Sequence, residues 1–234
     1  MKLGSLVQTI RTQANPDKVK IFQWFFKTKI GEYGYGDKFL GLTTPQTRII
    51  SKKYFDLSLT DLQTLIRSPY HEECGIALQI LVLQFGRFSS SMEIQIFNFY
   101  LKNTKYINNW DLVDISAPKI VGAYLSDKPR DILYQLVRSN NLWERRIAII
   151  SCFYFIKSRD LTDALRISRI LLSDKHDLIH KAVGWMLREI GKRDEKVLLN
   201  FIKANYPKIP RTTLRYAIEK FPQAQRQKLL TGDI

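Results

Sequence analysis

The first segment whose side chains could do chemistry is the NNWDLVD stretch at residues 108–114. If this stretch is helical, Trp110 and Asp114 share a face, because residues four apart lie one above the other. An asparagine can cap such a helix, and Asp111 in its first turn suits the helix dipole, so Asp111 has a structural explanation. Asp114 has none, and in so basic a protein it needs either a function or a cationic partner.

The second segment, residues 179–192, combines a tryptophan with cations. At about 100° per residue, one narrow stripe carries Lys181, Trp185, Arg188 and Lys192, while apolar residues fill the opposite side. The core therefore does not need Trp185. The indole could form a cation–π lid or pack on the next helix. It could also be a platform for a deoxyribose or base beside phosphate-binding cations, which we favour because ring and charges coincide.

The third segment is LWERRIAII at residues 142–150, which begins a helix that is apolar almost all round and therefore buried. Two arginines, Arg145 and Arg146, stand at its start, where we expect other charges to hold them. Periodicity alone does not decide which of the two faces a cleft.

Helices must position these segments, and the sequence predicts helices throughout. Apolar residues recur with a period of 3.6, and no segment alternates as a strand would. Start signals stand at 15–17, 44–45, 60–61 and 128–131, and further amphipathic stretches cover about 70–86, 91–103, 109–117, 118–126, 141–157, 160–172, 175–191, 194–205 and 211–221.

Short helices with short polar breaks predict stacked antiparallel pairs. We expect an all-α fold, one α-solenoid domain of HEAT-like repeats over residues 1–234 with a concave basic face. An irregular helical bundle is the alternative. Residues 28–43 interrupt the pattern with glycines and tyrosines, but they lack the spacing of a phosphate-binding loop. We expect a structural loop there, and a contact of Tyr33 or Tyr35 with DNA stays open.

The composition narrows the function classes. The chain has 37 Lys and Arg against 22 Asp and Glu, a formal charge of +15, which suits a polyanionic partner, and its 45% hydrophobic residues exclude a disordered basic tail. No apolar run is long enough to span a membrane, and nothing resembles a signal peptide. With only two cysteines, a reducing, cytoplasmic location is the expectation.

Several catalytic signatures are absent from the sequence. The three histidines are scattered, and His176 with His180 suits a solvated or capping role better than a metal site. No nucleophile elbow occurs, and neither cysteine has a recognisable nucleophile setting. We expect neither a metal nor a cofactor.

The segments NNWDLVD, LWERRIAI and KAVGWMLRE resemble signature stretches of the AlkD-type DNA alkylation repair family, which are HEAT-like-repeat DNA glycosylases. GDKFLGLTTPQTR and PRTTLRYAIEKF match as well, so the resemblance spans nearly the whole chain in order. It places the family's cleft residues on Trp110, Asp114, Arg146 and Trp185. One departure is Phe25, where some members have a tyrosine, and no role is carried over to it.

The resemblance implies a monofunctional glycosylase that removes cationic N3- or N7-alkylated purines from duplex DNA and leaves an abasic site for base excision repair. It implies that Asp114 stabilises the sugar cation and positions water, that both tryptophans flank the lesion nucleotide, and that Arg146 holds a phosphate or orients Asp114. It also implies that the base enters no deep pocket. We expect Lys181, Arg188 and Lys192 to bind DNA, a monomer without membrane contact, and nucleoid association in a prokaryote. A non-catalytic DNA-binding HEAT module and a protein-interaction scaffold are the alternatives.

Overall fold

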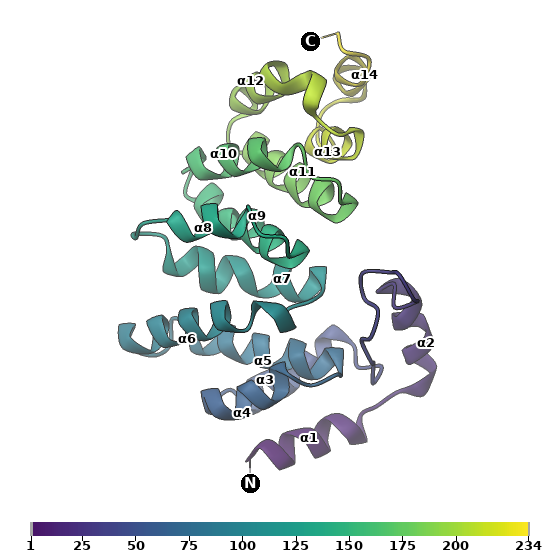
Figure 1. The fold of residues 1–234 in the computed structure, drawn as a ribbon, viewed down its shortest axis with the longest axis vertical. Helices are drawn as coiled ribbons and strands as arrows, with labels where there is room; N and C mark the ends of the chain where they lie inside the picture. Colours follow the sequence, from purple (N-terminus) through teal and green to yellow (C-terminus); the bar gives the residue numbers. More distant parts are fainter. Residues whose placement is uncertain (1, 234) are drawn as a thin grey trace. The chain divides into compact units, whose positions relative to one another are not determined.

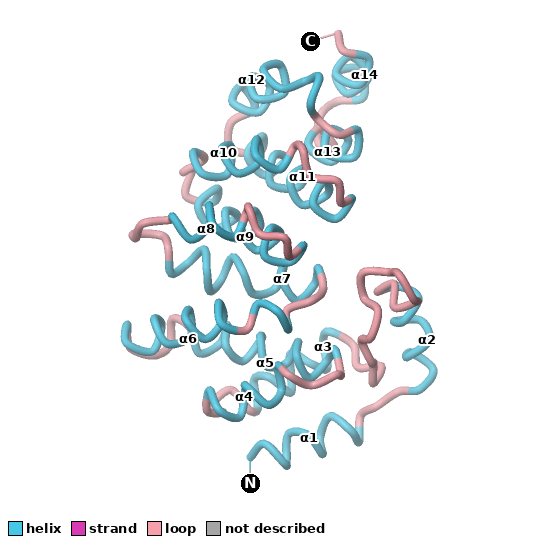
Figure 2. Tube along the Cα trace, in the orientation of Figure 1, coloured by secondary structure: helices cyan, strands magenta, loops and turns pink. Residues whose placement is uncertain are grey.

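The computed structural model describes residues 2–233, which form fourteen α-helices without a strand (Figures 1 and 2). A single isolated bridge joins Lys38 and Tyr70 within this range. The predicted all-α class of stacked helices is confirmed. The chain divides into two compact units, residues 1–124 and 125–234, and each is described by itself. The single domain and the concave basic face stay predictions.

The first unit is built around α5, which is buried on nearly every side and packs against α3, α4 and α7. Asn15 caps α2 by accepting the backbone N–H groups of Asp17 and Lys18, as its place before Pro16 predicts. The elements of this unit are α1 (Lys2–Thr12), α2 (Pro16–Phe25), α3 (Thr44–Lys53), α4 (Leu59–Ile66), α5 (His71–Gln84), α6 (Ser90–Lys102), the 3₁₀ turn η1 (Thr104–Tyr106), α7 (Trp110–Ala117) and the π-helical turn η2 (Pro118–Gly122).

The second unit is built around α11, which packs against α9, α10, α12 and α13. Gly184 lets α11 and α13 approach closely, because a Cβ atom there would lie 2.5 Å from Cβ of Tyr216 and 2.7 Å from the carbonyl oxygen of Thr213. The elements of this unit are α8 (Asp131–Leu136), α9 (Leu142–Lys157), α10 (Thr162–Leu171), α11 (Asp177–Gly191), α12 (Glu195–Asn205), the 3₁₀ turn η3 (Tyr206–Lys208), α13 (Arg211–Ala217) and α14 (Gln223–Thr231).

The structure differs from the predicted elements at four places. Helices α1 and α14 were not expected. Helix α4 begins at Leu59 after the cap Ser58, not at Thr60. The stretch 118–126 is not a separate helix, because η2 follows α7 directly as a π-helical turn. Residues 28–43 form the expected loop (Figure 2).

Both cysteines are free and buried. The thiol of Cys74 donates to the carbonyl oxygen of Tyr106 in the first unit, and that of Cys152 donates to the carbonyl oxygen of Ala148 in the second. Burial raises the pKa of both thiols above its ordinary value. Separately, no helix among the described residues is long and apolar enough to cross a membrane.

Candidate nucleic-acid site

Helix α7 carries the first pair of predicted site residues. The side chain of Asn109 accepts the backbone N–H of Trp110 at 2.9 Å and begins the helix there. Asp114 lies four positions after Trp110, and both side chains are partly exposed. Leu112 is buried in the core of the unit. The helix therefore places an indole and a carboxylate on one face, as the spacing predicts.

An aromatic cluster that the sequence did not reveal supports Trp110. The ring of Phe25 meets the indole edge-on at a centroid distance of 5.8 Å, and the ring of Phe26 stacks on it at 5.7 Å. Phe26 also lies 4.7 Å from the imidazole of His71 and stacks on Phe39 at 5.2 Å. Trp110 is thus held in a fixed orientation by rings from the end of α2.

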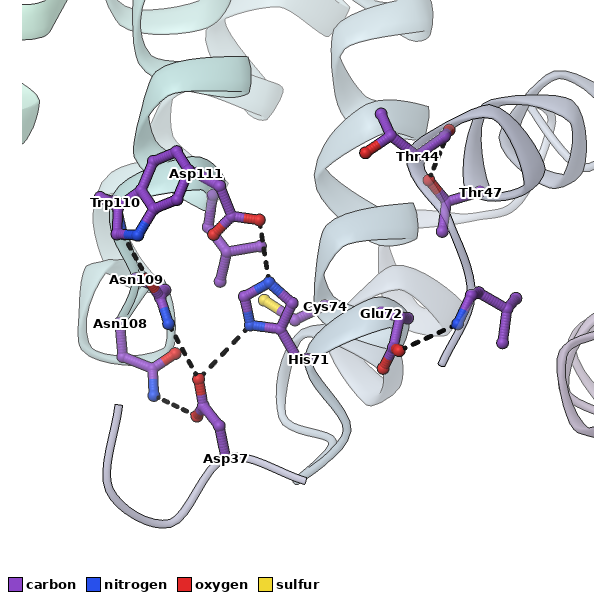
Figure 3. Close-up of polar contacts among 12 residues, drawn as sticks. Asp37, Thr44, Thr47, His71, Glu72, Cys74, Asn108, Asn109, Trp110 and Asp111 are labelled. Atoms are coloured by element: carbon purple, nitrogen blue, oxygen red, sulfur yellow. Dashed lines mark hydrogen bonds and ion pairs between the residues drawn. The ribbon is translucent and has the colours of Figure 1, made fainter. Parts of the chain in front are cut away.

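A buried histidine bridges two aspartates beside this cluster (Figure 3). Nε2 of His71 lies 2.9 Å from Oδ2 of Asp111, and its Nδ1 lies 3.4 Å from Oδ2 of Asp37. Asp37, within the loop of residues 28–43, also accepts hydrogen bonds from the side-chain amides of Asn108 and Asn109 at 2.8 and 3.3 Å. The loop thereby ties the starts of α5 and α7 together.

The interpretation of Asp111 as a helix-dipole residue alone was wrong. Asp111 does lie in the first turn of α7, but it is also the principal partner of a histidine 40 residues away. Burial alone would lower the pKa of His71, but Asp111 and then Asp37 overcome this and raise it to about 10. His71 is therefore an imidazolium at neutral pH, with both ring nitrogens donating.

Glu72, which follows His71 in α5, holds residues 40–42 near the end of the same loop. Its buried carboxylate accepts the backbone N–H groups of Leu40, Gly41 and Leu42 at 2.8–3.2 Å. Gly41 is required there, since its φ is +84° and a Cβ would lie 2.1 Å from the carbonyl oxygen of Asn15. Glu72 is the means by which α5 fixes residues 40–42.

The charged state of His71 predicts a pH dependence of stability. Its folded pKa of about 10 lies above the ordinary value of 6.5. The unfolded chain therefore releases this proton first, and the contribution to stability is complete below pH 6.5 and is lost as the pH rises through 10. Urea unfolding at pH 6 to 10 should show a steeper alkaline decline in the free energy of unfolding for the wild type than for His71→Gln. If the free energies of unfolding of the two proteins changed in parallel with pH, the ion pairs of His71 with Asp111 and Asp37 would be contradicted.

In the second unit, the two arginines at the start of α9 have different partners. Arg145 Nε pairs with Asp174 at 2.6 Å, and its Nη1 donates to two backbone carbonyl oxygens. Arg146 is only 4% exposed, and its Nη1 donates to the carbonyl oxygen of Leu178 at 2.7 Å. The Asp174 ion pair confirms that a neighbouring charge holds Arg145, and Arg146 is tied to the start of α11.

The stripe on α11 is also formed as expected. The apolar side chains opposite it are buried, while Trp185 is partly exposed and lies 5.7 Å from the ring of Phe153. Each cation of the stripe has a carboxylate partner: Lys181 pairs with Asp177, Arg188 with Glu219, and Lys192 with Glu189. A phosphate contact would have to compete with these pairs. Nearby, His176 caps α11 through its Nδ1 and Leu178 N–H, which confirms the capping role.

The described residues contain no group of three His, Cys, Asp or Glu that could hold a metal ion. The family model for DNA alkylation repair enzymes matches residues 6–221 of the chain. The chain belongs to the DNA alkylation repair enzyme family. It therefore has a role in the repair of alkylation damage, with DNA as its partner.

One similar solved structure is described as a predicted DNA alkylation repair enzyme from Enterococcus faecalis. It is 17% identical, covers 90% of this chain and 98% of its own, and has a TM-score of 0.69. At this identity the likeness shows the fold. A comparison with curated proteins gives no match.

For this DNA alkylation repair protein, the α11 cations predict the salt dependence of DNA binding. If Lys181, Arg188 and Lys192 each contact a phosphate, replacing any one of them by alanine should flatten the slope of log K against log salt by about 0.9. Fluorescence anisotropy with a labelled duplex at several salt concentrations measures this. Lys2→Ala removes an ion-paired lysine outside the stripe and is the control. An unchanged slope in all three variants would show that these α11 cations do not contact the phosphates of DNA.

Trp185→Ala should strongly reduce repair activity on alkylated duplex DNA, while the protein should stay folded with only a modest loss of stability. The buried face of α11 is complete without the indole, so the stability loss should fall below the about 3–5 kcal/mol typical of a fully buried tryptophan. Thermal unfolding and an activity assay on alkylated duplex DNA measure the two effects. A collapse of stability of the larger size would instead show that Trp185 is a packing residue.

Proposed function

We propose that the protein is a monofunctional DNA glycosylase that hydrolyses the N-glycosidic bond of cationic N3- or N7-alkylated purines in duplex DNA and leaves an abasic site. The observation that carries the proposal is the pair of Trp110 and Asp114 on one face of α7 in a member of this repair family.

Cleavage of this N-glycosidic bond does not require the protein to protonate the leaving base. An alkylated purine already carries a positive charge, so it leaves as a neutral base and needs no general acid. The sugar develops oxocarbenium character, which a carboxylate stabilises electrostatically while it orients the attacking water. In the proposed mechanism Asp114 performs both tasks, and the π face of Trp110 favours the cation and excludes bulk water.

The second unit is proposed to contribute binding. Trp185 would contact the sugar and backbone of the lesion strand from α11, and Arg146 would bind a phosphate from α9. Lys181, Arg188 and Lys192 would add sequence-independent phosphate contacts. Arg145 pairs with Asp174 and Arg146 donates to the carbonyl oxygen of Leu178, so the choice of Arg146 rests on the family resemblance.

The direct test is release of 7-methylguanine and 3-methyladenine from methylated duplex DNA, followed by chromatography of the free bases. We expect base release with abasic sites and no strand cleavage, and no release from unmethylated duplex. DNA binding without release would favour the non-catalytic DNA-binding module instead. Absence of both binding and release would favour a protein-interaction scaffold.

A further inference from the structure

The first unit contains a small pocket over α5, between α3 and the turn η2 that follows α7. Arg48 and Lys52 line it from α3, Lys119 lines it from η2, and Ile115 lines it from α7. Its volume of about 180 Å³ lies below the about 300–1,000 Å³ of ordinary small-molecule sites. The pocket therefore suits a small group better than a whole nucleotide.

The pocket gathers positive charge without a carboxylate. Its ionisable lining residues are Arg48, Lys52 and Lys119, and all three are exposed to solvent. Arg48 and Lys52 are four apart on α3, so they share a face, and a like-charge pair at this spacing is destabilising. The arrangement is unfavourable in the free protein, and a bound anion would remove the repulsion.

These three cations differ from the cations of α11 in having no carboxylate partner. Within residues 2–233, no ion pair or hydrogen bond engages the side chain of Arg48, Lys52 or Lys119. By contrast, each of the three cations on the α11 stripe already pairs with a carboxylate. An anion that enters the pocket displaces no carboxylate, whereas an anion that binds at α11 does.

The pocket adjoins the face of α7 that carries the candidate glycosylase residues. Ile115, in its wall, directly follows Asp114. Lys119 comes five positions after Asp114, which corresponds to about 7 Å along a helix axis. It belongs to the π-helical turn η2, and such turns are rare and frequently found at functional sites. An anion in the pocket would therefore lie close to whatever Asp114 faces.

The proposed role of Asp114 creates a need for such a site. A carboxylate that acts on a deoxyribose also repels the phosphates attached to that sugar. Cations in the same unit that hold a neighbouring phosphate would offset this repulsion, and phosphate contacts fix the register of a protein on DNA. The three cations of the pocket have the charge and the place for this task.

We propose that the pocket of Arg48, Lys52 and Lys119 binds one phosphodiester group of the DNA backbone beside the lesion nucleotide. The planar guanidinium of Arg48 can donate two parallel hydrogen bonds to phosphate oxygens, and the two ammonium groups act as point charges around them. This inference rests on the proposed function, to which it adds the contact that holds the lesion strand against α7.

The test is the salt dependence of the binding of unmodified duplex DNA to the full chain, measured by fluorescence anisotropy. The double variant Lys52→Ala/Lys119→Ala should flatten the slope of log K against log salt by about 0.9, because the pocket no longer neutralises its phosphate. It should fold normally, since neither lysine has a partner to lose, and its thermal unfolding midpoint should equal or exceed that of the wild type.

The double variant Lys53→Ala/Lys102→Ala is the matched control, because it removes the same charge from the first unit outside the pocket lining. Lys53 follows Lys52 on α3 but lies over the ring of Tyr54. The control should keep the slope of the wild type. An unchanged slope in the pocket variant, or an equal change in the control, would overturn the proposal.

Inorganic phosphate separates a backbone site from a site for free phosphate. A single phosphate ion lacks the neighbouring contacts that hold DNA, so replacing part of the chloride by phosphate at constant ionic strength should leave the duplex affinity of the wild type unchanged. A loss of affinity that the pocket variant does not share would show that the pocket takes free phosphate, and would overturn its assignment to DNA.

The failures of the two proposals are distinguishable. Release of methylated bases by the wild type with an unchanged slope in the pocket variant would reject the phosphate site and retain the glycosylase. A flattened slope in the pocket variant without base release by the wild type would reject the glycosylase and retain the phosphate site.

Discussion

Replacement of Asp114 by asparagine should lower the rate of 7-methylguanine release by about 10²–10³-fold. Asparagine keeps the size and hydrogen-bonding capacity of the side chain but removes the charge that we propose faces the developing sugar cation, and groups preorganised for a transition state have effects of this size. Single-turnover kinetics on methylated duplex DNA measure the loss. DNA affinity should hold or rise, because one anion leaves the surface that is proposed to bind DNA.

The control for this variant cannot be Asp111, because its partner is the buried His71. Asp131→Asn is suitable, since Asp131 is an exposed first-turn residue of α8 whose charge acts mainly on the helix dipole. It should cost only a few tenths of a kcal/mol in stability and leave base release unchanged. Equal release by the two variants would show that the catalytic carboxylate is misassigned.

Replacement of Glu72 by alanine should lower the free energy of unfolding of the protein by about 3 kcal/mol or more. The buried carboxylate accepts three backbone N–H groups, and each would lose its partner at a cost of about 1–3 kcal/mol, partly recovered where water enters. Urea unfolding followed by circular dichroism measures the loss.

Glu93→Ala provides the matched comparison, because Glu93 is also a glutamate in the first turn of a helix but has a partly exposed side chain. Glu93→Ala should lower the free energy of unfolding by only a few tenths of a kcal/mol, which is what a favourable charge near a helix N-terminus contributes. If the free energy of unfolding fell equally in the two variants, Glu72 would act only on the dipole of α5 and would not fix the loop.

The local parts of the structure could be predicted from the sequence. The shared face of Trp110 and Asp114 and the stripe of α11 follow from a period of 3.6, which depends on neighbours three and four residues apart. Helix α14 was missed because its residues are polar almost all round, with only Leu229 buried. No apolar face marks it.

The non-local parts of the site could not be predicted in this way. Asp37, His71 and Asp111 lie 34 and 40 residues apart along the chain, and only the folded loop brings them together. One sequence signal was available, namely that His71 and Glu72 are polar residues at the start of a helix that is largely apolar and buried. Buried polar residues require partners, so these two positions indicated a network without identifying its other members.

The burial of both thiols has a chemical consequence for a protein that repairs alkylation damage. Methylating agents are electrophiles, and the sulfur nucleophile they attack most readily is the thiolate. Cys74 and Cys152 are the chain's only cysteines, both are buried in the core of their unit, and burial raises the pKa of both thiols and so lowers an already small thiolate fraction at neutral pH. Burial thereby shields the two thiols of this DNA alkylation repair protein from the reagents that alkylate DNA.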